Sequence, residues 1–582
     1  MISDQKLVYC ETFRFFETLS KNNLNMKSNY RKILNLLLTL VLCVYFTSCN
    51  KSTTSKNKNT SSATGWAINS KKGGFKYNTN FKGQDTPPNM VLIEGGTYTK
   101  GRVQDDPMRD WNNTPNQQHV MSFYMDATEV TNVMYLEYLD WLKRNYPPED
   151  QKFSRIYYNA LPDTLVWRNK LGYSEDMVNN YLRHPAFGDY PVVGVSWIQA
   201  YEFSEWRSDR YQELILERQG YITKGSKIDS VSSTSTFSTD TYVLVPNSTY
   251  GGNTNVLRGK RSRGPDSLPP TSASRETGHI SPKFRLPTES EWEYAALGLN
   301  EVRDFNLYRG RKKYPWQGQY TRTGQRKNLG DQLANFKNSD GDYGGIAGWS
   351  DDGADITNQV RSYQANEFGL YDMAGNVAEW VADVYRPIVD DEFNDFNYFR
   401  GNDYKKFSIG PDGKATVVGP DEIEYKTLSN GKEVATRLPG EIATEDLTEL
   451  DTRYRTQFDK SYNVNFRDGD FLSSRNYDPE NRKLERASGS DEETRMMYKS
   501  PSYNDANPST PAFDYDPSEN KTTLVNDQAR VYKGGSWKDR AYWLDPAQRR
   551  FYPQDQATDF IGFRCAMSRV GSKTFNMKKT RN

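Results

Sequence analysis

The stretch NEFGLYDMAGNVAEW, residues 366–380, is the most informative run in the chain. Asp372 and Glu379 flank a loop that contains Gly375, so backbone carbonyls of this loop can point inward beside two carboxylates. This oxygen-rich set suits a hard cation such as Ca²⁺, which takes about six to eight oxygen ligands. The alternative interpretation is that these Asp, Asn and Gly residues only form turns.

Strand and helix signals alternate on both sides of this stretch. MVLIEGGTYTKG, residues 90–101, predicts a strand and a tight turn at Gly95-Gly96. FYMDATEVTNVMYLEYLDWLKR, residues 123–144, changes from a strand pattern to a helical period. The pairs Ser196–Gln199 and Thr288–Glu291 have the spacing of capping boxes, which predicts two more helices. The pattern resumes at RVYKGGSW and ends at DFIGFRCAMSRV.

Two long segments interrupt this order. Residues 218–282 are rich in Ser, Thr, Gly and Lys, with one predicted strand at TYVLVP, residues 241–246. Residues 388–528 are dense in charged and aromatic residues but poor in aliphatic runs. We expect this second insert, together with residues 537–550, to be a docking surface rather than an independent core, because long loops inside compact domains are usually functional or disordered. Deletion of residues 390–520 is expected to leave a folded domain.

The N-terminal region has the pattern of a bacterial lipoprotein. Lys27 and other basic residues precede an apolar run from Ile33 to Phe46, and the run stops at the sequence FTSC, which ends at Cys49. The apolar run is shorter than the roughly 17–25 residues that a transmembrane helix needs. We expect synthesis to start at Met26, with residues 1–25 an upstream extension, 26–48 a signal peptide and Cys49 the lipidated first mature residue. Residues 49–88 then form a flexible tether.

Composition excludes several function classes. The net charge of +1 gives no global field that would attract nucleic acid. Two of the four cysteines precede the predicted cleavage point, Cys49 would carry lipid, and Cys565 is left without a partner, so an exported domain has no internal disulfide. Three widely spaced histidines fit surface or packing roles, and a zinc site of the Cys/His type is excluded. The basic segment 572–582 is an exposed tail.

Seven blocks, in order, resemble the formylglycine-generating enzyme (sulfatase-modifying factor) family: MVLIEGGTYTKG, FYMDATEVTN, PVVGVSW, RLPTESEWEYAA, NEFGLYDMAGNVAEW, KGGSW and GFRCA. The resemblance implies an irregular α+β fold with little regular sheet, related to C-type lectin folds. It places one domain at residues 89–571, with the inserts at 218–282 and 388–528 as excursions from it.

Active members of that family use two cysteines after the GGS motif to bind copper. Counting on from Gly534-Gly535-Ser536, the matching positions hold Asp539 and Leu544. A carboxylate and an alkyl group cannot replace a thiolate pair that binds soft Cu(I). We therefore expect neither copper nor enzyme activity. A hydrolytic site at Ser536 and Asp539 is also not expected, because no His lies nearby in the sequence.

The resemblance also implies two calcium sites. One would use Asp372, Glu379 and the carbonyls of Gly375 and Val377, and Glu129 matches a further acidic ligand. The second would use ligands from two other loops: Asn335, Asp352 and the carbonyls of Phe336 and Ala354.

A domain of this kind on a lipoprotein resembles the gliding-motility lipoproteins of the Bacteroidetes group. That resemblance implies a non-enzymatic component of gliding and type IX protein secretion, partnered by other lipoproteins of that machinery and by outer-membrane components. Its place would be the outer membrane, lipid-anchored on the periplasmic face, since no acidic run follows Cys49. The alternative is a calcium-dependent carbohydrate-binding module in which Trp537, Tyr542 and Trp543 form a stacking platform, although such aromatics more often belong to a core.

Overall fold

The computed structural model describes residues 60–101, 115–168, 173–223, 232–257, 273–299, 312–338, 354–385, 403–446, 461–464 and 528–571, with short gaps inside the first, fourth, seventh and eighth ranges. The predicted signal peptide, Cys49 and the basic tail lie outside these residues. The chain divides into two units, Met1–Phe81 and Lys82–Asn582. Among the described residues, no helix is long and apolar enough to cross a membrane.

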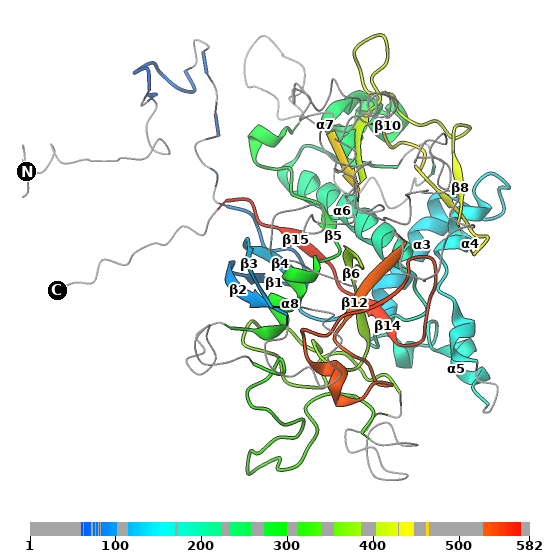
Figure 1. Cartoon of the computed structure of the whole chain (residues 1–582). Helices are drawn as coiled ribbons and strands as arrows, with labels where there is room; N and C mark the ends of the chain where they lie inside the picture. Colours follow the sequence, from blue (N-terminus) through cyan, green and yellow to red (C-terminus); the bar gives the residue numbers. More distant parts are fainter. Residues whose placement is uncertain are drawn as a thin grey trace, which may run out of the picture. The chain divides into compact units, whose positions relative to one another are not determined.

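Two four-stranded sheets form the centre of the larger unit (Figure 1). The first has the order β1 (Met90–Ile93), β4 (Phe123–Asp126), β15 (Ala566–Ser568), β5 (Phe284–Arg285). The second has the order β13 (Arg550–Pro553), β12 (Ala529–Lys533), β6 (Ala378–Val384), β14 (Ile561–Phe563). All pairs are antiparallel except β14 with β6. The C-terminal strand β15 lies between β4 and β5, and β6 lies between β12 and β14, so the C-terminal strands are integral to both sheets.

The predicted helices begin where the capping boxes place them. Ser196 Oγ accepts from Gln199 N, and Gln199 Oε1 accepts from Ser196 N, at the start of α6 (Trp197–Gln219). Thr288 and Glu291 make the same reciprocal pair at α8 (Glu289–Leu297). The other helices follow: α3 (Asn132–Asn145), α4 (Ser154–Ala160), α5 (Glu175–Asn180), and the 3₁₀ turns Thr164–Trp167, Pro185–Phe187, Pro246–Gly252, Thr254–Val256, Arg275–Thr277 and Ala541–Leu544.

The predicted strand and turn at residues 90–101 are confirmed. β1 is followed by β2 (Gly96–Lys100), which pairs with β3 (Asn116–Val120) in a separate two-stranded sheet. The change from strand to helix over residues 123–144 is also confirmed, because β4 precedes α3. A mixed helix-and-strand architecture thus follows from the sequence pattern, although the strands are distributed over several small sheets.

The predicted strand at TYVLVP is wrong, because this segment begins as helix α7 (Thr239–Leu244). The Asp209 carboxylate on α6 accepts hydrogen bonds from both Thr239 N and Thr239 Oγ1, and so caps the first turn from another helix. Tyr242 then packs against Phe237 in a small apolar cluster. The tertiary cap overrides the strand preference of the β-branched residues.

The first part of the second insert is folded onto the domain. Its strands form a sheet of order β10 (Thr444–Asp446), β7 (Asp403–Phe407), β11 (Ser461–Val464), and a hairpin of β8 (Tyr425–Thr427) and β9 (Glu433–Ala435). Phe407 and Ile442 are buried in the main core cluster, which also contains Tyr146 and Phe153. The expectation that residues 390–520 can be deleted as a unit is therefore wrong for residues 403–446, since their removal would expose this core.

The contact between α6 and the insert predicts a pH-dependent stability. Burial, and then the charge of Glu441 in the insert, raise the pKa of Glu202 on α6 to about 8. A carboxyl whose folded-state pKa is raised stabilises the fold below its unfolded pKa, about 4.3, and this contribution is lost as pH rises through the folded value. The substitution Glu202→Gln is expected to raise the free energy of unfolding at about pH 8 by on the order of 1–2 kcal/mol and to change it little at about pH 4.

Urea unfolding of the two proteins across this pH range measures the difference. The control is Glu137→Gln on α3, which removes an exposed carboxylate from a neighbouring helix and should be neutral at every pH. A stabilisation by Glu202→Gln that is equal at both ends of the pH range would contradict the assignment.

Residues 60–81, described by themselves, form a small turn around Asn69. Its Nδ2 donates to Tyr77 O, and its Oδ1 accepts from Tyr77 N, both at 2.8 Å. Trp66, Phe75 and Tyr77 remain exposed. A segment with so little buried surface fits the predicted tether better than a further domain.

Candidate functional site

A double-glycine turn leads from β12 into the segment where the resemblance places the cysteine pair. Gly534 and Gly535 both have positive φ, +96° and +70°, a region that side chains rarely adopt. A Cβ on Gly535 would also lie 2.9 Å from the backbone oxygen of Trp543. The two glycines are required here because the chain must turn sharply while the next segment packs against it.

Asp539 lies in this segment and is held in a closed ion pair. Arg550, from β13, donates from Nη1 to Asp539 Oδ1 at 2.5 Å and from Nη2 to Oδ2 at 2.6 Å. Ser536 Oγ donates to the same Oδ2 at 2.6 Å. The guanidinium also lies over the rings of Tyr532 and Trp543, 4.7 and 4.5 Å from their centroids. The hydrogen bonds of this carboxylate are thus made to groups of its own chain.

Leu544, at the second position, is fully buried. It belongs to an apolar cluster with Tyr314, Ala334 and Phe336 from the loops at residues 312–338. The two matched positions therefore serve packing and an internal ion pair.

The Asp539 ion pair predicts a measurable loss on substitution. Asp539→Ala leaves the partly buried Arg550 without its carboxylate, and this should lower the free energy of unfolding by about 2–3 kcal/mol. Thermal or urea denaturation measures this loss. The neighbouring exposed Arg540 provides the control, since Arg540→Ala should cost less than about 0.5 kcal/mol. Equal effects of the two substitutions would show that the ion pair does not stabilise the fold.

Three buried carboxylates meet around the opening sequence stretch. Glu379 Oε1 accepts from Arg564 Nη2 at 2.6 Å, and its Oε2 accepts from Arg564 Nε and Trp292 Nε1, both at 2.7 Å. Glu129 accepts from Asn376 Nδ2 at 2.7 Å. Asp372 Oδ2 accepts from the backbone N–H of Arg361, whereas its Oδ1 is buried without a hydrogen-bond partner in the described part of the chain.

The ionisation of these carboxyls reflects their crowding. Burial, followed by the charges of Asp372 and Glu379, raises the pKa of Glu129 well above its ordinary value. Burial is also the main cause that raises the pKa of Asp372 to about 6. If all three carboxylates are ionised, the guanidiniums of Arg564 and Arg361 offset their negative charge only in part. The group therefore has the electrostatics of a site for a divalent cation.

The residues of the second expected calcium site are only partly described. Asn335 is buried, its Nδ2 donates to Ile356 O at 2.7 Å, and its Oδ1 has no partner among the described residues. Phe336, which follows Asn335, and Ala354, in the other loop, are both buried. Asp352 lies outside the described residues. The backbone connects the two expected sites, because Asn376 N donates to Asn335 O at 2.8 Å.

Each expected site thus contains a buried side-chain oxygen without a hydrogen-bond partner among the described residues, Oδ1 of Asp372 in the first and Oδ1 of Asn335 in the second. A cation could bind to these oxygens. Glu379 retains acceptor capacity at Oε1, since a carboxylate has about four lone-pair positions. The described residues contain no group of three His, Cys, Asp or Glu side chains arranged to hold a metal. Backbone carbonyls would therefore have to complete the coordination, as the expected ligands Gly375 and Val377 require. The residues fit calcium on the criterion of donor chemistry.

A second buried ionic cluster was not predicted from the sequence. Lys533 Nζ lies 3.0 Å from Glu293 Oε2 and 3.3 Å from Glu289 Oε1. Glu289 also pairs with Arg549 at 2.6 Å and with Lys100 at 3.2 Å. The six members of this network carry three positive and three negative charges: Lys100, Lys533, Arg549, Glu289, Glu293 and Asp383. One member, Lys533, lies directly before the double-glycine turn in the chain, so the network holds the residue from which that turn begins.

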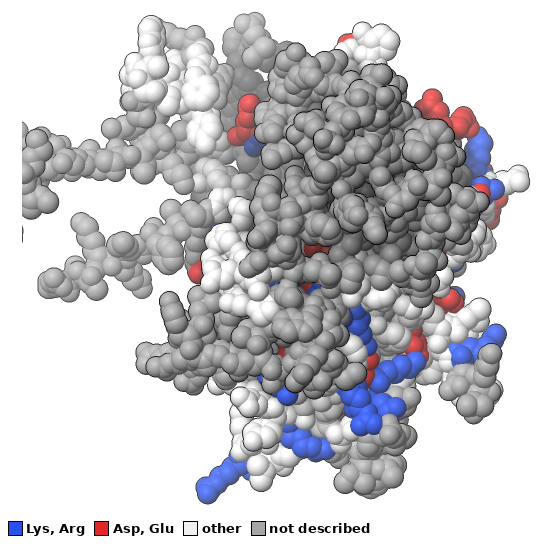
Figure 2. All heavy atoms as spheres, viewed as in Figure 1, with Lys and Arg blue, Asp and Glu red and all other residues white. Residues whose placement is uncertain are grey.

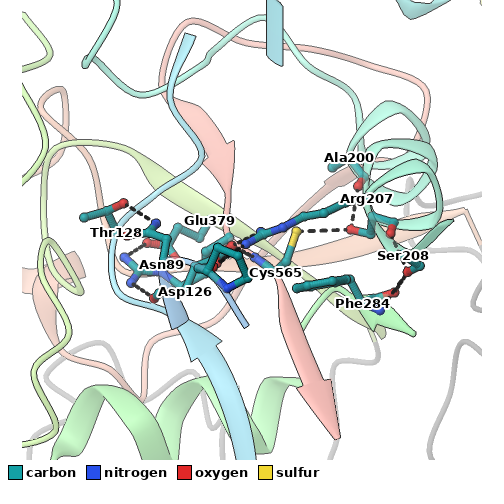
Figure 3. Close-up of polar contacts among 12 residues, drawn as sticks. Asn89, Asp126, Thr128, Ala200, Arg207, Ser208, Phe284, Glu379 and Cys565 are labelled. Atoms are coloured by element: carbon teal, nitrogen blue, oxygen red, sulfur yellow. Dashed lines mark hydrogen bonds and ion pairs between the residues drawn. The ribbon is translucent and has the colours of Figure 1, made fainter. Parts of the chain in front are cut away.

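Cys565 lies in a third buried polar group (Figure 3). Its backbone N–H donates to Asp126 Oδ2 at 2.9 Å, and its Sγ is 3.4 Å from Ser204 Oγ on α6. Arg207 binds Asp126 through both terminal nitrogens, at 2.7 and 2.9 Å. Burial, and then the charge of Asp126, raise the pKa of the Cys565 thiol to about 12. This thiol is therefore a structural group that joins α6 to the sheet.

The aromatic platform expected for a carbohydrate-binding module is not formed. Trp537 is buried, donates from Nε1 to Asp559 O at 3.1 Å and stacks on Trp167. Tyr542 and Trp543 are half-buried and lie edge to face against each other. The core interpretation of Trp537 is confirmed.

Comparison with known proteins adds the family context. The sequence model described as "Sulfatase-modifying factor enzyme 1-like domain" matches residues 76–421. The serine/threonine-protein kinase pkn1 of Chlamydia pneumoniae is 25% identical over 346 residues, covering 59% of this chain and 32% of that protein. The formylglycine-generating enzyme of Mus musculus is 24% identical over 331 residues, covering 54% of this chain and 64% of that protein. The inactive C-alpha-formylglycine-generating enzyme 2 of Mus musculus is 32% identical over 107 residues, covering 18% of this chain and 27% of that protein. The chain spans less than two thirds of each relative.

Proposed function

Because the chain belongs to the sulfatase-modifying factor enzyme 1-like domain family, we propose that it is a non-catalytic, structural member of that family. The observation that carries this proposal is the use of the two matched positions. Asp539 is committed to Arg550 and Ser536, and Leu544 is packed in an apolar cluster. Neither position offers a thiolate for copper, and the fold is kept while the chemistry is lost.

Oxygen consumption with a sulfatase-type cysteine peptide tests the non-catalytic proposal. The purified chain, loaded with copper, is expected to leave the peptide thiol unchanged, as read by mass spectrometry. A catalytically active formylglycine-generating enzyme measured in parallel shows that the assay works. Conversion of the peptide cysteine to an aldehyde by this chain would overturn the proposal.

We further propose that the domain binds calcium through the carboxylate group around Asp372. One support is the surplus negative charge of Glu129, Asp372 and Glu379, which the nearby arginines offset only in part. The other is the pair of buried oxygens, on Asp372 and Asn335, that lack partners in the described chain. Bound calcium would neutralise this surplus and join the two loops that Asn335 and Asn376 already link. Its role would be structural, since the site lies within the folded core.

The cellular role that we propose is a lipid-anchored component of gliding motility and type IX protein secretion. The support is the lipoprotein pattern that ends at Cys49, joined to a family domain without the cysteine pair. Within that machinery we propose the role of the gliding-motility lipoprotein GldJ, with that of its paralogue GldK as the alternative. The proposed partners are other lipoproteins and outer-membrane components of that machinery, reached from the periplasmic face.

Two measurements test this role. Mass spectrometry of the mature N-terminus should find a lipidated Cys49, and an unmodified peptide spanning residues 45–55 would exclude the anchor. Cross-linking and pull-down from the native membrane should then recover components of the machinery. A variant lacking residues 466–526, which keeps strands β7 to β11, should lose these partners but remain folded. Normal gliding and secretion by that variant would show that this part of the insert is not a docking surface.

A further inference from the structure

Residues 319–333 form a projecting hairpin that the family resemblance did not single out. Its two arms are joined by hydrogen bonds from Leu333 N to Thr321 O and from Thr323 N to Asp331 O, both at 2.9 Å. The side chain of Arg322 also donates from Nη1 to Gly330 O at 2.7 Å, which links the arms. At the base, Trp316 Nε1 donates to Tyr320 O at 2.8 Å. The hairpin is therefore held in one conformation by its own polar contacts.

The hairpin is fixed to the segment that follows the double-glycine turn. Lys337 N donates to Asp539 O at 2.9 Å, and Arg540 Nη1 lies 3.4 Å from Asn338 O. Tyr314 and Phe336, just outside the two arms, are buried together with Leu544. These contacts give the hairpin a rigid base, and a rigid element loses little entropy when it binds.

Positive charge gathers over this part of the molecule, as Figure 2 shows on its lower face. Among residues 312–338, Asp331 is the one acidic residue. The cations that form what we call the basic face lie on the hairpin, on its base and on the adjoining segment: Lys313, Arg322, Arg326, Lys327, Lys337 and Arg540. Arg326 and Lys327 are exposed at the tip, and neither has an acidic partner in the described chain.

Apolar side chains accompany these charges. Tyr320 is 80% exposed and Leu329 is 73% exposed, which is unusual for side chains on an ordered hairpin. Tyr320 lies next to the base of the hairpin, and Leu329 lies next to its tip. A surface that mixes Arg, Tyr and an aliphatic residue has the composition of a protein-binding patch, because Tyr and Arg dominate binding energy at interfaces.

We propose that the basic face binds an extended acidic segment of a partner protein that also carries hydrophobic side chains. The cations continue from the tip at Arg326 to the base at Arg540, so they fit an elongated chain along the hairpin. A lipid surface would be touched by the tip alone, where Leu329 is the one exposed large apolar residue described. This proposal adds to the proposed function the chemistry of a partner. It rests on the proposed function only in expecting that partner among the components of the motility and secretion machinery.

Binding of a labelled peptide of about 16 residues, rich in Asp and Phe, tests the proposal with the soluble chain from Asn50 onward. The double variant Arg326→Glu/Lys327→Glu should weaken binding at least about tenfold, and the affinity of the original chain should fall steeply with salt. Tyr320→Ser should weaken binding of this peptide but leave binding of a poly-Asp peptide unchanged, because it removes only an apolar contact.

The matched control is Arg183→Glu/Arg275→Glu, which makes the same charge change at two exposed arginines outside the basic face. This control should retain the affinity of the original chain within about twofold. Equal losses in both double variants would mean that the peptide senses only overall charge and would overturn the proposal. Tighter binding to phosphatidylglycerol vesicles than to the Asp/Phe peptide would replace it by a lipid surface. These outcomes do not depend on the motility role, which the native pull-down tests separately.

Discussion

Replacing Lys533 with Met is expected to lower the free energy of unfolding by about 3–5 kcal/mol, because removal of one partner leaves buried charges uncompensated. The Lys533 side chain is fully buried between Glu289 and Glu293. Burial alone would raise the pKa of Glu289, but Arg549, Lys100 and Lys533 together hold this pKa well below its ordinary value. Glu289 keeps Arg549 and Lys100 in the variant, whereas Glu293 loses the charge of Lys533.

The double variant Lys533→Met/Glu293→Gln distinguishes a lost ion pair from a lost packing contact. Gln can still accept from Gly101 N, which Glu293 Oε1 binds at 2.8 Å, and it carries no charge. The double variant should therefore be about 1–2 kcal/mol more stable than Lys533→Met alone. Lys538→Met is the control, because this lysine is partly exposed and pairs with one carboxylate, that of Asp559, outside the network. Urea unfolding gives the four free energies.

Two results would contradict this interpretation. If the double variant is less stable than the single variant, the charge on Glu293 is not what makes the single variant costly. If Lys538→Met costs as much as Lys533→Met, burial of the network does not determine the loss. Lys533 lies just before the Gly534-Gly535 turn, so the loss of its ion pairs should also loosen the Asp539 segment.

Local signals in the sequence were sufficient for the elements whose determinants are local. A capping box needs two residues three positions apart, and both boxes were found at Ser196 and Thr288. The helix α7 was missed because its cap, Asp209, lies 30 residues away on another helix. Secondary structure fixed by a distant side chain cannot be seen in a window of neighbouring residues.

The residues of the candidate site could likewise be predicted only where they lie close together in the sequence. Asp372, Gly375 and Glu379 could be found because one short stretch contains them. The ionic network could not, since its members come from segments near residues 100, 290, 383, 533 and 549, and Lys100 appears as an ordinary surface residue at the end of a strand. Its partner Glu289 lies in the first turn of α8, where an acidic residue also has the simpler explanation of favouring the helix dipole.

The insert gives a third case, where composition was misleading. Residues 388–528 contain few aliphatic runs, which predicts that the insert has no core of its own. Phe407 and Ile442 nevertheless complete the core of the domain. Two well-placed apolar side chains are enough to attach a polar segment, because burying one such side chain contributes about 1.5–3 kcal/mol.

Removal of calcium is expected to lower the melting temperature of the chain at neutral and higher pH. A ligand bound only by the folded state stabilises it by about 2.7 kcal/mol when its free concentration is 100 times the Kd. Without the ion, the carboxylates of Glu129, Asp372 and Glu379 repel each other, and the guanidiniums of Arg564 and Arg361 offset their charge only in part. Differential scanning calorimetry in calcium, in EGTA and in magnesium measures the effect, with magnesium expected to protect less.

The pH dependence of this effect has a defined sign. In the metal-free chain the pKa values of Asp372, about 6, and of Glu129 are both raised. Their protonated forms therefore stabilise the fold below the unfolded pKa of about 4, and this contribution is lost as pH rises through the folded values. Calcium requires the ionised carboxylates. EGTA loses its own calcium affinity when it is protonated, so the comparison at low pH uses chain stripped of metal at neutral pH and then dialysed. The difference between the calcium-loaded and the metal-stripped chain should be large at about pH 8 and should nearly vanish at about pH 4.5.

The variant Asp372→Asn separates calcium binding from a general effect of chelator. It removes one of the three carboxylate charges and keeps the side-chain shape, so the metal-free variant should be more stable than the metal-free original chain at about pH 8. Its melting temperature should no longer respond to calcium. Asp331→Asn, at an exposed position of the hairpin, is the control and should respond as the original chain does. A calcium response that persists in Asp372→Asn, or one that is equal at both pH values, would place the ion elsewhere in the chain.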